Sequence, residues 1–327
     1  MNLLLRLIKV FPPELSHAIA LNSLKILHFL NLIHLFFPKP KIQRVSLFGM
    51  DLVNRLGIAA GLDKNGDFID SLGSLGFGFI EVGTITPMAQ KGNPKPRIFR
   101  IFNENAIINR LGFNNKGVDH LVKKLKKRKF NGIVGVNIGA NKESSGQDRI
   151  NDYLTCFRKV HELCDYITVN ISSPNTPNLR DLHQSDNLTD LLNAIEGEVI
   201  KVNYAKPIFL KISPDESRES LESIIQAVDE SSFSGLIATN TTINKDNLEN
   251  PRYKKLTGGL SGKPLMSKST KTIIDIKNIS LNMDIIGVGG VMTKEDFHEK
   301  INAGAGLVQI YTGFIVHGPK IVNELLK

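Results

Sequence analysis

An alternation of strand-like and helix-like stretches, from Leu56 to the end of the chain, limits the possible folds more than any other feature of the sequence. Short apolar stretches rich in β-branched residues predict eight strands, at 56–60, 79–83, 133–138, 166–171, 208–212, 236–239, 285–288 and 307–311. Eight strands that alternate with helices favour a closed parallel barrel, the α/β fold known as the (β/α)8 or TIM barrel, which takes about 250 residues. A chain of 327 residues holds one such barrel.

The stretches between these strands are amphipathic and carry lysine and glutamate. They predict helices at 67–75, 116–129, 148–163, 188–202, 216–229, 267–279, 294–303 and 319–326. The uncharged window 301–319 reads as a barrel strand followed by a loop. Two longer connections, 84–114 and 240–265, leave from strand C-termini, where barrel enzymes build their sites. We expect the first of them to form a small β excursion over the barrel mouth.

The first 40 residues do not follow the alternation. They are rich in Leu, Ile and Phe, and Pro12 and Pro13 separate a short apolar helix from a longer one that continues to Phe37. Residues 1–44 contain six basic residues and one acidic residue, so they hold +5 of the net charge of +9. We therefore divide the chain into an N-terminal amphipathic helical segment, residues 1–40, and a barrel domain, residues 41–327.

This N-terminal segment is too short in apolar length to cross a bilayer. Only 13 uncharged residues lie between Lys25 and Lys39, whereas a span needs about 20. Two interpretations remain open. The segment is either a helical hairpin that covers the core, or an interfacial hairpin whose basic residues face anionic lipid. The basic residues are not interleaved with aromatic ones, so we expect no nucleic acid partner.

Polar residues follow the predicted strands at their C-terminal ends. Asn137, Asn170 and Asn240 follow three different strands, and amides suit a flat ring system that needs both donors and acceptors. The Gly-Gly pair at 289–290 and the Thr-Gly pair at 312–313 lie where barrels commonly bind phosphate. Lys211 has three interpretations: a Schiff-base nucleophile, a cation beside an anionic cofactor ring, or a lysine that snorkels at the barrel rim.

Seven motifs in order along the chain resemble those of the dihydroorotate dehydrogenases, specifically the membrane-associated, quinone-linked class 2. The motifs are AGLDKNG at 60–66, EVGTITP at 81–87, NRLGFNN at 109–115, NISSPNTP at 170–177, ATNTT at 238–242, GGLSG at 258–262 and GVGG at 287–290. The resemblance covers essentially the whole chain, including the N-terminal segment.

The resemblance implies a flavoprotein oxidoreductase that converts dihydroorotate to orotate in pyrimidine biosynthesis. FMN would accept the hydride and a membrane quinone would be the final electron acceptor. Ser173 would be the catalytic base that removes the C5 proton, at the position where class 1 enzymes have cysteine. Thr176 and Phe113 match the neighbours of this base, and Thr176 would help to relay its proton.

The resemblance also implies the binding residues. Substrate contacts carry over to Lys64, Asn109, Arg110, Leu111, Gly112, Phe113, Asn170, Asn175, Asn240 and Thr241, with 109–113 closing over the ring. FMN contacts carry over to Ala60, Gly61, Leu62, Asp63, Lys64, Thr84, Asn137, Asn170, Lys211, Thr239, Gly262, Gly290, Tyr311 and Thr312. We expect no metal site.

The same resemblance places the protein at the periphery of the inner membrane, on its cytoplasmic face, with no dedicated protein partner. One alternative is a soluble dihydroorotate dehydrogenase that uses fumarate or NAD, against which Ser173 and the N-terminal segment argue. Another is a phosphosugar aldolase barrel with Lys211 as the Schiff base, which leaves the three strand-end amides unexplained. A non-catalytic membrane-binding module leaves every strand-end motif unexplained.

Overall fold

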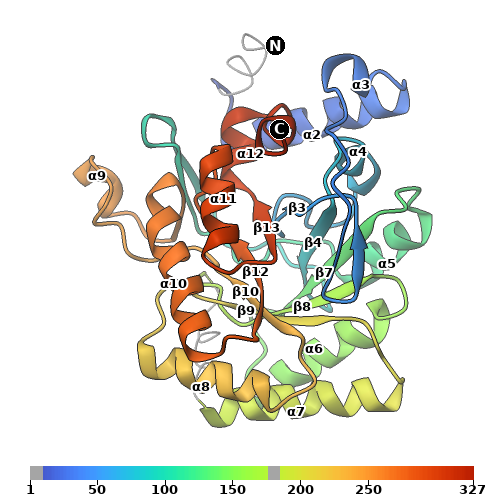
Figure 1. Cartoon of the computed structure of the whole chain (residues 1–327), viewed down its shortest axis with the longest axis vertical. Helices are drawn as coiled ribbons and strands as arrows, with labels where there is room; N and C mark the ends of the chain where they lie inside the picture. Colours follow the sequence, from blue (N-terminus) through green and yellow to red (C-terminus); the bar gives the residue numbers. More distant parts are fainter. Residues whose placement is uncertain (1–9, 176–184) are drawn as a thin grey trace.

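The computed structural model describes residues 10–175 and 185–327. Eight parallel strands close into a barrel (Figure 1). They are β3 (Leu56–Ile58), β4 (Phe79–Ile85), β7 (Ile133–Ile138), β8 (Tyr166–Asn170), β9 (Ile208–Ile212), β10 (Gly235–Ala238), β12 (Asp284–Val288) and β13 (Leu307–Ile310). The predicted TIM barrel is confirmed, and each strand end lies within two residues of its predicted position.

Helices surround the barrel (Figure 1). They are α4 (Ile69–Gly73), α5 (Val118–Lys127), α6 (Gly146–Val160), α7 (Ser185–Lys201), α8 (Arg218–Asp229), α10 (Met266–Ile279), α11 (Lys294–Asn302), α12 (Thr312–His317) and α13 (Ile321–Leu325). The structure corrects the prediction of a loop after the last strand, because α12 begins there at Thr312. A helix of six residues is too short to show helical periodicity, and Gly313 and Val316 have low helix propensity.

The inside of the barrel is layered because side chains on a strand alternate between its two faces. Near the strand N-termini, the rings of Phe79, Tyr166 and Phe209 pack edge to face, with centroids 6.3 and 5.8 Å apart. Two residues further along these strands, polar side chains take the inward positions, including Glu81 and Lys211. The period of two thus places apolar side chains inside the barrel near the strand N-termini, at its bottom, and polar side chains nearer the C-terminal ends, at its top.

A two-stranded hairpin covers the bottom. It consists of β1 (Val45–Leu47) and β2 (Met50–Leu52). Phe48, at its turn, packs against Phe209 with ring centroids 5.7 Å apart. Met50 and Leu52 are buried in the same cluster. This hairpin has no clear signal in the sequence, because strands of three residues are too short to show periodicity.

A three-stranded antiparallel sheet lies at the barrel mouth. Strands β5 (Ile98–Ile101) and β6 (Ala106–Asn109), joined by the 3-10 helix η1 (Phe102–Glu104), form the predicted excursion. Strand β11 (Gly259–Gly262) pairs with β6 and comes from the second long connection. That connection also contains α9 (Pro251–Lys254) and η3 (Lys263–Leu265).

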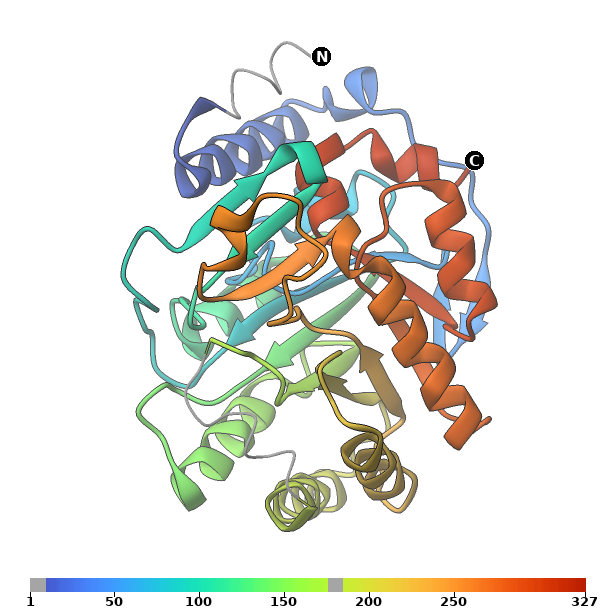
Figure 2. The ribbon, with the colours of Figure 1, turned by 90° about the vertical axis from the view of Figure 1, so that its left-hand side faces the viewer.

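The N-terminal segment forms α2 (Pro13–Phe29) and α3 (Ile33–Phe36), and α2 lies beside the β5–β6 hairpin (Figure 2). The expected continuous helix to Phe37 is wrong. Asn31 has a φ of 57°, a left-handed conformation that ends α2 and separates it from α3. None of the helices in the described part of the chain is both long and apolar enough to cross a membrane.

Candidate functional site

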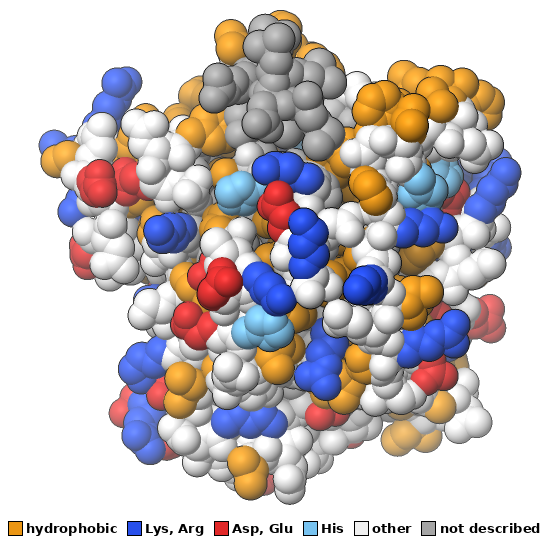
Figure 3. Space-filling view, turned by 45° about the horizontal axis from the view of Figure 1, so that its top comes forward, with side chains coloured by type: hydrophobic (Ala, Val, Ile, Leu, Met, Phe, Trp, Pro, Cys, Tyr) orange, Lys and Arg blue, Asp and Glu red, His pale blue; other side chains and the backbone are white. Residues whose placement is uncertain are grey.

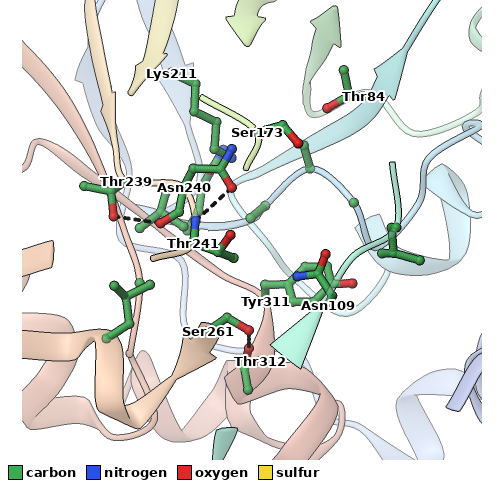
Figure 4. A pocket seen from close by; sticks show the side chains of 18 of the residues that line it. Thr84, Asn109, Ser173, Lys211, Thr239, Asn240, Thr241, Ser261, Tyr311 and Thr312 are labelled. Atoms are coloured by element: carbon green, nitrogen blue, oxygen red, sulfur yellow. Dashed lines mark hydrogen bonds between the residues drawn. The ribbon is translucent and has the colours of Figure 1, made fainter. Parts of the chain in front are cut away.

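A cavity lies between the C-terminal ends of the barrel strands and the sheet of β5, β6 and β11 (Figure 4). Most of the predicted site residues line it: Ala60, Gly61, Lys64, Thr84, Asn109, Leu111, Gly112, Phe113, Asn170, Ser173, Asn175, Lys211, Thr239, Asn240, Thr241, Gly262, Gly290, Tyr311 and Thr312. They come from segments spread over more than 250 positions of the sequence, and the barrel brings them together because all its strands point the same way.

Four predicted residues lie elsewhere. Arg110 is not among the lining residues: its guanidinium donates to the carbonyl oxygen of Pro96 and to Thr257, and stacks on Phe99. Leu62 and Asp63 line a second cavity, described below. Asn137 is fully buried and does not line the first cavity.

Thr176 lies outside the described residues.

The carboxylate of Asp63 accepts hydrogen bonds from the backbone N–H groups of Asp67 and Phe68 at 3.0 and 2.7 Å. Burial raises the pKa of Asp63 to about 6. These bonds indicate that Asp63 fixes the loop after β3, and they leave its oxygens turned away from the first cavity.

A chain of side-chain hydrogen bonds connects the ends of four strands, β4, β7, β8 and β10. Thr84 donates to Oδ1 of Asn137 at 2.6 Å, and Nδ2 of Asn170 donates to Thr84 at 3.0 Å. Nδ2 of Asn240 donates to the hydroxyl of Ser172 at 3.0 Å. The Ser172 hydroxyl in turn donates to Oδ1 of Asn170 at 3.2 Å. Because each amide is oriented by its neighbours, the wall presents donors and acceptors in fixed directions.

A buried carboxylate anchors the layer beneath this wall. Glu81 accepts hydrogen bonds from Asn137, Tyr166 and Gln309 at 2.8, 3.0 and 2.7 Å. The ammonium of Lys211 lies 3.9 Å from a carboxylate oxygen of Glu81. Burial lowers the pKa of Lys211, and the charge of Glu81 opposes that shift. The layer therefore pairs Lys211 with Glu81 at the base of the cavity.

Ser173 lies on the loop after β8 and is buried in the cavity wall (Figure 4). The backbone N–H of Asn175 donates to its hydroxyl oxygen at 3.3 Å. The side chain of Asn175 in turn donates to Oδ1 of Asn109 at 3.3 Å. Ser173 is thus held on the same face as the segment 109–113, which forms the outer side of the cavity.

Lys64 is a second cation in the wall. Its Nζ donates to the carbonyl oxygen of Gly61 at 2.5 Å. Burial is the main reason that the pKa of Lys64 falls to about 8. The ammonium is therefore mostly charged at neutral pH, and a bound carboxylate would favour that form.

Glycine backbone forms the far end of the cavity. Gly289 and Gly290 have φ values of +121° and +85°, and a Cβ on Gly290 would come within 2.4 Å of Cα of Met266. Only glycine fits there, and it brings backbone N–H groups to the cavity surface. The hydroxyl of Thr312 donates to Ser261 at 2.9 Å across the same end. This end suits a phosphate group.

Two buried polar atoms at the cavity have no hydrogen-bond partner within the described residues. They are the hydroxyl of Thr241 and Oε1 of Gln309. A buried polar group without a partner costs about 1–3 kcal/mol, so these atoms point to a polar ligand. A flat ring with polar edges and a phosphate tail, such as FMN, fits these atoms, Lys211 and the glycine backbone together.

A second cavity of about 460 Å³ lies between α2 and the barrel. Leu21, Leu24 and Leu27 of α2 line one side, and Phe314 and Ile315 of α12 line the other. The polar residues Arg100 and His17 also reach it. Desolvation, with the charge of Lys64, lowers the pKa of His17 to about 4, so its imidazole is neutral at pH 7. Four residues line both cavities: Lys64, Asn109, Leu111 and Tyr311.

Several positions of the site carry little or no local sequence signal. Glu81 and Gln309 lie inside apolar strands, and only their inward register in the period-two pattern could have singled them out. Ser172 is a direct neighbour of Ser173 in the same motif, and the sequence alone does not distinguish its role. The second cavity has no local signal, because α2 and α12 meet only in the fold. Across residues 10–175 and 185–327, no group of three or more His, Cys, Asp or Glu side chains is arranged to hold a metal ion.

Comparison with known proteins gives concordant results. The sequence profile of the family described as dihydroorotate dehydrogenase matches residues 42–327. The chain is 45% identical to the dihydroorotate dehydrogenase (quinone) of Marinobacter nauticus, over 100% of this chain and 96% of that protein. It is 46% identical to the dihydroorotate dehydrogenase (quinone) of Saccharophagus degradans, over 95% and 93% of the two chains. Among solved structures, DHODH from Eimeria tenella in complex with ferulenol superposes with a TM-score of 0.88 at 34% identity, over 96% of this chain and 89% of that one.

Proposed function

Because the chain belongs to the dihydroorotate dehydrogenase family, and its curated relatives are named as quinone enzymes, we propose that it oxidises dihydroorotate to orotate with FMN and a membrane quinone. Dihydroorotate would lose a proton from C5 and a hydride from C6; bound FMN would supply the hydride acceptor, and the quinone would finally take the two electrons. This reaction is the redox step of pyrimidine biosynthesis. The observation that carries the proposal is the wall of oriented amides around Ser173, next to a glycine-lined phosphate end.

Ser173 is proposed to take the C5 proton. A serine hydroxyl is a weak base, so it must be placed against the proton that it removes. The amides of Asn170, Asn175 and Asn240 are proposed to hold the substrate ring. Lys64 pairs with the substrate carboxylate, which supports its charged form. Holding the substrate by both its ring and its carboxylate leaves one orientation for the reacting atoms.

FMN supplies the hydride acceptor when it is bound. Lys211 is proposed to face its ring and to favour the negative charge that arrives with the hydride. The backbone N–H groups at Gly290 and Gly262 are proposed to hold the phosphate, with Thr312 beside them. Glu81 keeps Lys211 in place from below, so the cation remains fixed whether or not the flavin is reduced.

The N-terminal segment is proposed to dock on the cytoplasmic face of the inner membrane. Leu21 and Leu24 of α2 are buried against the barrel, while Phe29 and Leu35 are 81% and 76% exposed. A helix that is apolar on both faces needs two apolar surroundings. Figure 3 shows hydrophobic side chains gathered where α3 lies, with Lys and Arg side chains nearby. The protein core covers one face, and lipid is proposed to cover the other.

The second cavity is proposed to admit the quinone. Five leucine and four phenylalanine side chains contribute to its lining, and α2, the proposed membrane-docking helix, forms one of its sides. It also shares a wall with the first cavity, so the quinone head group would lie one layer of side chains from the flavin. A quinone that stays in the lipid phase could thus reach the flavin without passing through water.

The test begins with the full-length purified protein. We expect bound FMN, which dihydroorotate bleaches under anaerobic conditions, and faster turnover with a ubiquinone analogue than with fumarate or NAD. Faster turnover with either soluble acceptor would overturn the quinone assignment. A colourless protein that borohydride traps on a ketose phosphate would overturn the dehydrogenase assignment in favour of a Schiff-base aldolase.

A further inference from the structure

Arg97 is a buried cation that belongs to neither cavity's proposed chemistry. It lies in the connection between β4 and β5 and is only 7% exposed. Its Nε and Nη2 donate to the two carboxylate oxygens of Glu14 on α2, at 2.7 and 3.1 Å. Its Nη1 donates to the carbonyl oxygens of Lys91 and Asn93, at 2.6 and 3.0 Å. One guanidinium thus joins α2 to the loop 91–93.

The loop 91–93 in turn supports the outer side of the first cavity. The backbone N–H of Asn93 donates to the carbonyl oxygen of Leu111 at 3.0 Å. Its side-chain Nδ2 donates to the carbonyl oxygens of Arg110 and Asn175, at 3.1 and 3.2 Å. Asn93 therefore contacts both the segment 109–113 and the loop that carries Ser173.

The loop 91–93 and the segment 109–113 are closely packed against each other. Gly112 has a φ of +68°, and a Cβ at that position would come within 2.8 Å of the side-chain amide of Asn93. A Cβ on Gly92 would come within 2.3 Å of the carbonyl oxygen of Leu111. A shift of the loop 91–93 thus moves the segment that is proposed to close over the substrate.

We propose that Arg97 is a positioning residue for substrate binding, because it ties the seating of α2 to the placement of the segment 109–113. The inference rests on the proposed function, which puts dihydroorotate in the first cavity. Release of α2 takes away the carboxylate that orients the guanidinium of Arg97, and the loop 91–93, which bonds to that guanidinium, loses its link to α2. Because coupling between two binding events is reciprocal, bound substrate also strengthens the attachment of α2 to the barrel.

Glu14→Gln is the decisive variant, and Lys95→Gln is its matched control. Lys95 also pairs with Glu14, at 3.1 Å, but its side chain is 70% exposed. If Glu14→Gln acted only through the loss of its negative charge, orotate affinity would change in the direction opposite to the one that the proposal predicts. The negative charge of Glu14 helps to keep Lys64 charged, and its direct repulsion of an anion would be lost, so binding measured with Lys64 fully charged would become tighter. A positional effect makes binding weaker.

The experiment measures the dissociation constant of orotate by equilibrium dialysis with the full-length holoenzyme at pH 6.5, below the pKa of about 8 of Lys64. We expect Glu14→Gln and Arg97→Gln each to weaken orotate binding by about 5- to 20-fold, within the usual range of coupling between sites. Lys95→Gln should stay within about twofold of the wild type, the size of a surface pair. With a soluble dye as acceptor, KM for dihydroorotate should rise while kcat changes little.

The double variant and proteolysis complete the test. Glu14→Gln with Arg97→Gln should bind orotate no more weakly than the weaker single variant, because both remove one connection. Orotate should slow the proteolytic cleavage of α2 in the wild type and have no such effect in Glu14→Gln. Wild-type affinity in Glu14→Gln, or additive losses in the double variant, would overturn the inference while leaving the proposed function intact. A wild type that fails to bind orotate would instead overturn the proposed function.

Discussion

At the scale of single residues, the placement of Ser173 matters more than its intrinsic basicity. A positioned general base contributes about 10²–10⁴-fold to the rate of proton transfer. We expect Ser173→Ala to lose most of that rate while it still binds FMN and orotate. The measurement is single-turnover reduction of the flavin by dihydroorotate in a stopped-flow instrument.

A serine outside both cavities serves as the control for this variant. Ser213, directly after β9, is fully buried, and its hydroxyl accepts the backbone N–H of Asp215. Ser213→Ala should reduce the flavin at the wild-type rate. Near-normal reduction in Ser173→Ala would mean that another group removes the proton.

The shifted pKa of Lys64 predicts how substrate affinity depends on pH. The charged form pairs with the substrate carboxylate, and the pKa is lowered to about 8. Affinity for orotate should therefore be full below pH 7 and fall above pH 8, approaching tenfold per pH unit. Equilibrium dialysis between pH 6.5 and 9 measures this dependence.

Lys64→Arg separates this cause from others. Its guanidinium stays charged throughout that range, so the variant should lose the pH dependence even if its overall affinity is lower. If Lys64→Arg keeps the wild-type pH profile, Lys64 is not the group that titrates.

Many of the site residues could be predicted from the sequence because they directly follow apolar strands. Asn137, Asn170 and Asn240 stand out at strand ends for that reason, although Asn137 lies under the cavity and not in its wall. Glu81 could not be found in the same way, because it occupies an inward position within a strand. The placement of the Arg110 guanidinium depends on Pro96 and Thr257, and no local pattern reports such distant partners.

At the scale of elements, helix α2 shows what periodicity can and cannot tell. Within the helix predicted to continue to Phe37, the apolar residues Ile26 and Leu30 are exposed, whereas the barrel buries Leu21 and Leu24. The pattern indicated an amphipathic helix correctly in kind, but the choice of packing face depends on β5 and α4, which α2 contacts. Strand β11 was missed for a similar reason, since its partner β6 lies about 150 positions away in the sequence.

The exposed apolar residues of this segment predict a selective defect. Phe29→Glu with Leu35→Glu should reduce binding to lipid vesicles and raise KM for a long-chain quinone, because a buried charge in lipid is costly. Activity with a soluble dye should remain, and the thermal unfolding midpoint should change little, since both side chains are exposed. Sedimentation with vesicles and steady-state assays measure these effects.

Ile200 on α7 offers the matched control, because it is 78% exposed but lies outside the N-terminal segment. Ile200→Glu should bind vesicles and use quinone as the wild type does. Equal losses in Ile200→Glu and in the double variant would show that any added negative charge weakens membrane binding.

At the scale of the whole molecule, the uneven charge predicts salt-dependent membrane binding. Residues 1–44 hold +5 of the net charge of +9, and Lys25, Lys39, Lys41 and Arg44 are exposed. Each basic group near an anionic surface contributes about 1 kcal/mol, and salt screens this attraction over about 8 Å at physiological ionic strength.

We therefore expect binding to anionic vesicles to weaken as salt rises from 50 to 500 mM, with the solution conditions otherwise constant. Binding to uncharged vesicles, which depends on the apolar residues alone, should vary little over the same range. Salt-independent binding to anionic vesicles would remove any role for the basic residues in docking.

The side chains of Lys64, Asn109, Leu111 and Tyr311 form a wall between the first cavity and the second cavity. Under the proposed function, it acts as the separator does in an electrochemical cell, which passes charge and holds back the reagents. Dihydroorotate, which is soluble in water, and the quinone, which is soluble in lipid, then need no common solvent and no common entrance. Each half-reaction keeps its own entrance, and what crosses between them is electrons alone.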